Sequence, residues 1–177
     1  MKKLILTLTI LGIVSALSLA FVFEWTKPII EKHQEVAKKE AVLTVLLASD
    51  SYTEVTKSGI TFYEGDGDNE VAMMASGGGF QGQIELMIGA NPVDGKIYAI
   101  KVLNHSETPG LGANITGENF ESNFINKPFG DYRVVKRPIA EDIEVEAISG
   151  ATISSDKVTR IIEEAIDQIK LAYGGGA

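Results

Sequence analysis

The stretch EAISGATISS, residues 146–155, joins a short predicted strand to the clearest helical pattern of the chain. Beyond it, apolar residues recur at i, i+3 and i+4 spacing, at Val158, Ile161, Ile162, Ala165, Ile166 and Ile169. We expect this helix to begin just after Ser154-Ser155-Asp156, because such residues cap helices. A helix start offers unpaired N–H groups to a phosphate, and Gly150 and Ala151 leave room for a bulky ligand there.

A simpler interpretation of this stretch is an ordinary Ser/Thr-rich cap after a glycine turn. A Ser/Thr-Gly-Ala-Ser/Thr pattern arises by chance in about one chain in a hundred of this length. The functional interpretation is that Thr152 presents its hydroxyl to the exposed turn. Taken alone, the motif is a moderate signal.

A second motif, NHSETPGLG at residues 104–112, follows a predicted strand directly. Pro109-Gly110 suits the centre of a type II turn, and Gly112 adds conformational freedom. Without the first motif, a surface turn would be the favoured interpretation. The two motifs together favour a ligand site.

The segments before these motifs predict an antiparallel hairpin. Residues 83–88 alternate in polarity, Asn91–Gly95 forms a turn, and Lys96–Leu103 is the second strand. The preceding GGGFQG, residues 77–82, matches G-x-G-x-x-G, but a strand follows it instead of the helix that a dinucleotide fold requires. We therefore expect these glycines to allow a bulge or a close backbone approach.

Further predicted elements complete an α+β domain with an antiparallel sheet and packing helices. Residues 133–136 and 143–148 are short strand candidates, while the region after Ala48 is expected to be irregular. Gly65–Asp68 is the clearest turn there, and a solvated turn is favoured over a calcium loop because the terminal Glu ligand is missing.

The N-terminal part predicts a single transmembrane helix. Leu4–Phe23 carries no charge and has the length of about 20 residues that spans a bilayer. Lys2 and Lys3 precede it, and Trp25 suits the far interface. A cleaved signal peptide is the alternative, because Ser18-Leu19-Ala20 resembles a cleavage site, but the apolar run continues beyond it.

The chain is expected to divide into four parts. These are a transmembrane anchor (1–25), a connecting helix (26–50) that Pro28 opens, a binding domain (51–173) and a flexible tail (174–177). Lysines flank both ends of the anchor, so the positive-inside rule does not fix its orientation. The signal-like start favours a domain outside the cytoplasm.

Composition narrows the chemistry. The net charge of −8 disfavours nucleic acid, which needs clustered Lys and Arg. The absence of cysteine excludes disulfides, Cys-ligated iron–sulfur clusters and thioether-attached haem, and His33 and His105 are too few and too distant to suggest a metal site. If the chain transfers electrons, it must use an organic cofactor.

ETPGLG at residues 107–112 and SGATISS at residues 149–155 together resemble one family, the FMN-binding G subunit of Rnf ion-translocating oxidoreductases. The C subunit of sodium-translocating NADH:quinone reductase is its relative. The resemblance implies an FMN joined through its phosphate to Thr152 by a flavin transferase that uses FAD. The family commonly has Asp three residues before the motif, where this chain has Glu146, which keeps the carboxylate.

The resemblance also assigns roles around the cofactor. Ser149, Gly150 and Ala151 are expected to line the phosphate side, with Ser155 capping the helix beside it. In the second motif, Glu107 and Thr108 are expected near the flavin edge and Leu111 on a ring face. No catalytic residue beyond the flavin and no metal are expected. His105 would tune the flavin or, as we favour, serve the local structure.

The resemblance implies an electron relay in the inner (plasma) membrane, with its domain on the extracytoplasmic side. Its partners would be the other membrane and peripheral subunits of an Rnf-type complex, which couples ferredoxin:NAD+ electron transfer to Na+ or H+ translocation. The lipid bilayer and the maturing flavin transferase would be further partners. Two alternatives stay open: a C-type subunit of the quinone reductase, and a flavin-free single-pass sensory or binding ectodomain.

Overall fold

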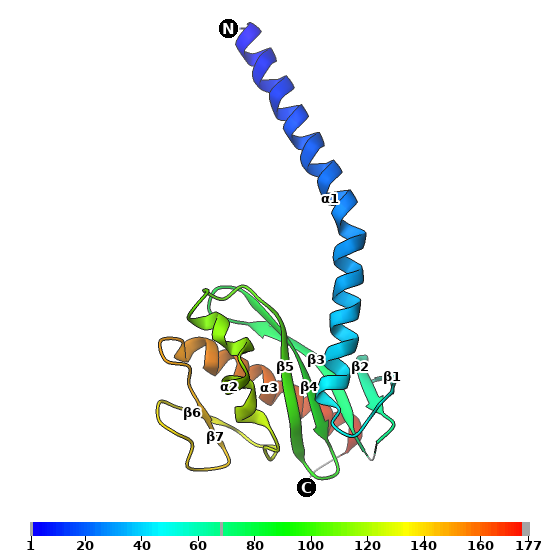
Figure 1. Ribbon diagram of the computed structural model, residues 1–177, viewed down its shortest axis with the longest axis vertical. Helices are drawn as coiled ribbons and strands as arrows, with labels where there is room; N and C mark the ends of the chain where they lie inside the picture. Colours follow the sequence, from blue (N-terminus) through cyan, green and yellow to red (C-terminus); the bar gives the residue numbers. More distant parts are fainter. Residues whose placement is uncertain (1, 68, 175–177) are drawn as a thin grey trace. The chain divides into compact units, whose positions relative to one another are not determined.

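The computed structural model describes residues 2–67 and 69–174, and its contacts divide the chain into two units, residues 1–38 and 39–177 (Figure 1). The first unit contains most of helix α1 (Lys2–Val45). The second unit contains the last turns of α1, all of the strands and the C-terminal helix. Of the expected tail, only Gly174 lies within the described residues.

Helix α1 has the length and composition of a membrane span. An 18-residue window within it has a mean hydropathy of 2.4 and is 0% buried. The hydroxyls of Thr7, Thr9 and Ser18 donate to carbonyls four residues earlier, at 2.9, 2.9 and 2.8 Å. These three polar side chains in the apolar run are thereby paired without a partner from outside the helix.

Pro28 lies inside α1, so the expectation that it opens a separate connecting helix is wrong. A proline removes one N–H donor, but the turns on either side keep their own hydrogen bonds. The anchor and the connecting segment therefore form one continuous helix.

The second unit is built on a five-stranded antiparallel sheet with its strands in sequence order (Figure 1). The strands are β1 (Tyr52–Lys57), β2 (Ile60–Gly65), β3 (Val71–Gly78), β4 (Gln83–Asn91) and β5 (Lys96–His105). The predicted hairpin of residues 83–103 is confirmed as β4 and β5, joined by the Asn91–Gly95 turn. The predicted antiparallel sheet is also confirmed.

The region after Ala48 is not irregular as expected, because residues 52–78 form three of the five strands. In β3, Met73 and Ala75 belong to one core cluster and Ala72 belongs to the other. A strand that is covered on both faces has no alternation of polar and apolar residues, and so it lacks the usual sequence signal.

Helix α3 (Thr152–Tyr173) covers one face of the sheet and buries the predicted stripe. Val158, Ile162 and Ile169 are 0% exposed. Gly77 permits this packing, since a Cβ there would lie 2.6 Å from Cγ1 of Ile161. The close backbone approach that the glycine run predicts is thus confirmed at this position.

The last turns of α1 pack on the opposite face of the sheet, where Ala41, Val42, Val45 and Leu46 form a second core cluster. Gly89 of β4 lies directly against the backbone of Val45 and leaves no space for a Cβ. The carboxylate of Glu70 accepts hydrogen bonds from Ala48 N–H (3.0 Å) and the Ser49 hydroxyl (2.6 Å). These contacts attach the end of α1 to the sheet.

Short elements cover the free edge of β5. They are η1 (Gly112–Thr116), α2 (Glu118–Glu121) and η2 (Ser122–Phe124). Glu121 accepts a hydrogen bond from the edge N–H of Val102 at 3.0 Å and pairs with Lys101 at 2.9 Å. The edge of β5 is thereby covered, so that a strand of another chain cannot pair with it there.

The remaining strands, β6 (Arg133–Val135) and β7 (Glu144–Glu146), form a parallel pair. They confirm the two short strand candidates in slightly shorter form. β7 leads directly into the stretch that precedes α3.

The close contact at Gly89 predicts that one added methyl group at this position destabilises the protein. Gly89→Ala should lower the free energy of unfolding by about 1–3 kcal/mol, because the methyl group must push the α1 end off the sheet. Gly78→Ala is the matched control, since a Cβ on that strand glycine meets nothing within 4 Å. Denaturant unfolding of the full chain in detergent measures both, and equal stabilities of the two variants would contradict the packing described.

Candidate functional site

A cavity of about 520 Å³ lies at the N-terminal end of α3. This volume falls within the range of about 300–1,000 Å³ that is typical of ligand sites. Four segments far apart in the sequence line it: the turn after β3, the loop after β5, the residue after β6 and the stretch from β7 into α3. The lining residues are Phe80, Glu107, Thr108, Leu111, Gly112, Lys136, Glu146, Ala147, Ile148, Ser149, Gly150, Ala151, Thr152, Ile153 and Ser154.

Helix α3 begins at Thr152, earlier than the expected start after Ser154-Ser155-Asp156. Ala151 occupies the cap position, and no side chain caps the helix. The first N–H groups of α3 are therefore free of side-chain acceptors and carry the partial positive charge of a helix start. Thr152, half-buried, lines the cavity at this point.

The expectation that Ser155 caps the helix beside the cofactor is wrong. Ser155 is 0% exposed and is not among the lining residues. Its hydroxyl accepts a hydrogen bond from Ile148 N–H (3.0 Å) and donates to the carbonyl of Ala151 (3.1 Å). Ser155 therefore links the loop that precedes α3 to the first turn of this helix.

Gly150 brings the two motifs into contact. Its φ of +78° is a left-handed conformation that other residues seldom adopt, and a Cβ there would lie 3.1 Å from Cδ2 of Leu111. A side chain at this position would both strain the backbone and press on the 107–112 loop. Gly150 thus allows the turn before α3 to lie close to Leu111 in the wall of the cavity.

Glu107 connects its own loop to two other lining segments, the turn after β3 and the start of α3. Its carboxylate accepts hydrogen bonds from Phe80 N–H (2.7 Å), Gln81 N–H (3.1 Å) and the Ser154 hydroxyl (2.6 Å). The residue is 5% exposed. Gly79 and Gly112 flank the carboxylate, and a Cβ on either glycine would collide with its oxygens.

The hydrogen bonds keep Glu107 ionised. Burial raises the pKa of its carboxyl, but the bonds from Ser154, Gln81 and Phe80 outweigh burial and hold that pKa below the ordinary value. Together these donors compensate for placing the charge inside the protein. Glu107 lines the cavity, and its oxygens accept hydrogen bonds from the protein itself.

His105 lies just outside the cavity lining. Its Nδ1 accepts a hydrogen bond from Glu107 N–H at 3.2 Å. That bond fixes the backbone turn that aims Glu107 inward. The geometry favours the structural interpretation of this histidine over a direct role at the cofactor.

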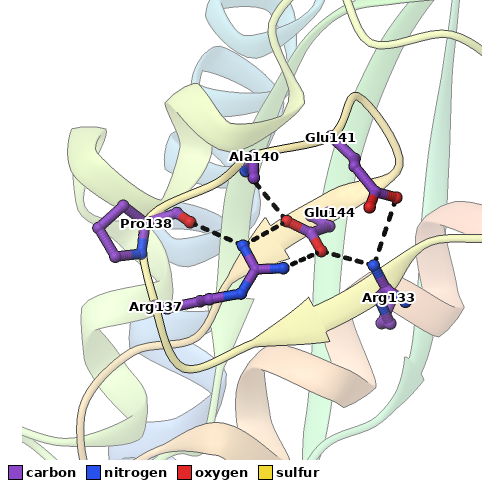
Figure 2. Close-up of polar contacts among 6 residues, drawn as sticks. All are labelled: Arg133, Arg137, Pro138, Ala140, Glu141 and Glu144. Atoms are coloured by element: carbon purple, nitrogen blue, oxygen red, sulfur yellow. Dashed lines mark hydrogen bonds and ion pairs between the residues drawn. The ribbon is translucent and has the colours of Figure 1, made fainter.

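A buried carboxylate also organises the loop between β6 and β7 (Figure 2). Glu144 is 0% exposed and accepts hydrogen bonds from Arg133 (2.6 Å), Arg137 (2.6 and 2.9 Å) and Ala140 N–H (3.0 Å). The bond from Ala140 and the two guanidinium groups lower the pKa of Glu144 to about 2, against the opposing effect of burial. Residues 136–143 are thereby folded around a single carboxylate.

The lining offers two kinds of surface. The free N–H groups at the start of α3 and the hydroxyls of Ser149 and Thr152 suit a phosphate group. Phe80, Leu111 and Ile153 are 59%, 47% and 54% exposed and suit a flat apolar ring. A nucleotide with an aromatic ring system fits this combination of donors and apolar walls.

Residues 79–167, about half of the chain, match the FMN-binding domain family. The chain is also 30% identical over 170 residues to the G subunit of the proton-translocating ferredoxin:NAD+ oxidoreductase complex of Clostridium ljungdahlii, spanning 95% of this chain and 91% of that protein. This chain belongs to the family of FMN-binding G subunits.

Other comparisons agree with this membership. A second relative is the G subunit of an ion-translocating oxidoreductase complex of Methanosarcina acetivorans, 32% identical over 97% of this chain and 96% of that protein. A third is the G subunit of the Na+-translocating ferredoxin:NAD+ oxidoreductase complex of Acetobacterium woodii, 28% identical over 93% of this chain and 89% of that protein.

Solved structures show the same fold. NqrC of Shewanella oneidensis superposes with a TM-score of 0.56 at 21% identity, covering 73% of this chain and 74% of that chain. The C subunit of the Na+-translocating NADH-quinone reductase of Parabacteroides distasonis gives a TM-score of 0.55 at 25% identity, covering 67% of this chain and 63% of that chain.

The structure brings nearly all of the sequence-predicted site residues together around this cavity. These are Ser149, Gly150, Ala151, Thr152, Glu107, Thr108 and Leu111, whereas Ser155 lies behind the loop. Sequence reasoning missed Phe80 and Lys136 as lining residues. Phe80 lies inside the glycine run, whose proximity to the helix start depends on the sheet and has no local sequence signal.

Removing the Glu107 carboxylate should loosen the cavity. Glu107→Ala should lower the free energy of unfolding by about 3–5 kcal/mol, because two N–H groups and one hydroxyl lose their acceptor. Glu107→Gln keeps a carbonyl for the N–H groups and should cost about 1 kcal/mol. Denaturant unfolding of the full chain measures both, with the exposed Glu54→Ala as control; similar stabilities for Glu107→Ala and Glu54→Ala would refute the role of Glu107.

The Glu144 carboxylate should give a characteristic pH dependence of stability. Because its folded-state pKa lies below the ordinary value of 4.5, at about 2, wild type should be more stable than Glu144→Gln at neutral pH. That advantage should shrink as the pH falls from about 4.5 towards 2. Unfolding curves across this pH range test it, with Glu54→Gln as control, because Glu54 is exposed and lies outside this network. A gap that stays constant down to pH 2 would contradict the arrangement in Figure 2.

Proposed function

We propose that the protein is a membrane-anchored flavoprotein electron carrier whose FMN is bound covalently, by a phosphoester to Thr152. The observation that carries this proposal is the position of Thr152, at the uncapped start of α3 and in the lining of the cavity. Membership of the FMN-binding family supports the identity of the cofactor. The FMN supplies the redox chemistry, and the protein supplies its location and surroundings.

The attachment is a group transfer from FAD. The bond between the two phosphates of FAD breaks, and AMP leaves with the electron pair of that bond. The Thr152 oxygen forms a new bond to the phosphate of the FMN part and gives up its proton. The resulting diester carries about one negative charge, which the N–H groups at the start of α3 are placed to stabilise.

The flavin transferase that installs the FMN must reach Thr152 from outside. Ser149, Gly150 and Glu146 are all exposed or half-exposed around it, so the motif is accessible on the rim of the cavity. Glu146 is fixed there by its N–H, which donates to the side-chain oxygen of Asn123 at 3.0 Å. We infer that the exposed carboxylate of Glu146 contacts the transferase.

The relatives support a place for the carrier in an Rnf-type complex. Their names specify ferredoxin:NAD+ oxidoreductase complexes that translocate protons in one case and Na+ in another. We infer that this chain relays electrons between the other subunits of such a complex. The length and apolar composition of α1 support its role as an anchor in the plasma (inner) membrane. We place the FMN-binding domain on the extracytoplasmic side as part of this proposal.

A C-type subunit of a sodium-translocating quinone reductase is the second candidate, and the fold comparison alone would allow it. Identity favours the G subunit, because the match to the Clostridium ljungdahlii protein reaches 30% over nearly the full chain, against 21% and 25% over shorter parts of the chain for the two C subunits. A flavin-free sensory ectodomain is the candidate from a different class, and the following experiment distinguishes it.

The proposed linkage predicts flavin fluorescence that survives denaturation. The full chain, produced together with a flavin transferase, should give a fluorescent band on a denaturing gel at its mass of 19.0 kDa plus that of the cofactor. Thr152→Ala should abolish that fluorescence while the protein remains at normal abundance, because the acceptor oxygen is lost.

Thr116→Ala is the control, since Thr116 is an exposed threonine outside the cavity lining. It should fluoresce like wild type. Fluorescence that persists in Thr152→Ala would disprove the assignment of the site. A wild-type band without fluorescence, with an active transferase present, would favour the sensory ectodomain.

A further inference from the structure

Lys136 is the one cationic side chain in the cavity lining, among the residues that the structure describes. It lies at the surface and follows directly on strand β6. Within residues 2–67 and 69–174 its ammonium group forms no hydrogen bond or ion pair, unlike its neighbour Arg137. The ammonium group of Lys136 is therefore available to pair with an anionic group of a bound ligand.

The backbone around Lys136 is held on both sides. Before it, the carbonyl of Val135 accepts a hydrogen bond from Ala147 N–H at 2.8 Å. After it, the guanidinium of Arg137 is bound to the buried carboxylate of Glu144 (Figure 2). These two attachments fix the start of the loop beside the stretch that leads to Thr152.

Apart from Lys136, the described lining of the cavity provides hydrogen-bond donors for an anion but no full positive charge. Glu107 and Glu146 are the two other charged residues in its lining, and both are carboxylates. The N–H groups at the start of α3 provide only a partial positive charge. An anionic ligand would gain from a full positive charge in the same cavity, because charges a few ångströms apart interact appreciably even near a surface.

We propose that the Lys136 ammonium is the counter-charge of the flavin nucleotide in this cavity. The inference rests on the proposed function, and it assigns Lys136 to an anionic group of the bound FMN. Two groups have this chemistry. One is the phosphodiester at Thr152, and the other is the reduced ring, which becomes an anion when the neutral oxidised ring takes up two electrons and one proton.

The test uses the full chain carrying covalent FMN, as wild type, Lys136→Gln and Lys136→Arg. Lys157→Gln is the matched control, because it removes the same charge from α3 at a residue outside the cavity lining. Intact mass first establishes that each protein carries one FMN. Spectroelectrochemistry then gives the midpoint potential of the flavin, and ³¹P NMR gives the resonance of the phosphodiester.

If Lys136 faces the ring, Lys136→Gln should destabilise the reduced flavin. The equilibrium constant for reduction should then fall by about threefold to tenfold, as for the loss of an exposed charge pair. That factor lowers the potential of a two-electron couple by about 14–30 mV. If Lys136 faces the phosphodiester, the ³¹P resonance should move instead. In either case Lys136→Arg should restore the wild-type value and Lys157→Gln should leave it unchanged.

The proposal is overturned if neither quantity changes in Lys136→Gln, or if Lys157→Gln changes them equally. In those cases the wild-type chain still carries its FMN, so the proposed function stands. A wild-type chain that carries no covalent FMN would instead be a failure of the proposed function. The intact mass separates these two results.

Discussion

The site depends on one buried carboxylate with no cation bound to it among the described residues. Glu107 holds the turn at Phe80, its own loop and the first turn of α3 through three hydrogen bonds, the shortest of them 2.6 Å from Ser154. Each segment is on a different part of the chain, so the cavity exists only once the sheet and α3 have come together. The glycines on either side are required because the carboxylate fills the space that their side chains would occupy.

That constraint accounts for several residues of the two motifs at 107–112 and 149–155. In ETPGLG, the Glu supplies the carboxylate and the last glycine makes room for it. In SGATISS, Gly150 lets the loop pass Leu111, Ser154 donates to Glu107, and Ser155 closes the loop on Ile148. Much of both motifs therefore builds the cavity, which leaves Thr152 at an uncapped helix start.

The sequence predicted the parts of this protein whose signals are local. The stripe of α3, the hairpin of β4 and β5 and the two motifs were all readable from spacing and turn residues. Strand β3 was not, because Ala72 and Met73 are buried on opposite faces. The prediction for Pro28 was wrong because a helix can continue through a proline. The prediction for Ser155 was wrong because its hydroxyl accepts a hydrogen bond from the preceding loop instead of capping the helix. Phe80 and Lys136 reach the cavity only through tertiary contacts.

The central claim is that Thr152 carries FMN through a phosphoester. Trypsin should release residues 137–157 as one peptide, because the Arg137-Pro138 bond resists cleavage and the next lysine is Lys157. Fragmentation of that peptide, from protein matured with its transferase, identifies the modified side chain. We predict the mass of FMN less one water on Thr152. An unmodified peptide, or a flavin on Ser149, Ser154 or Ser155, would contradict this claim.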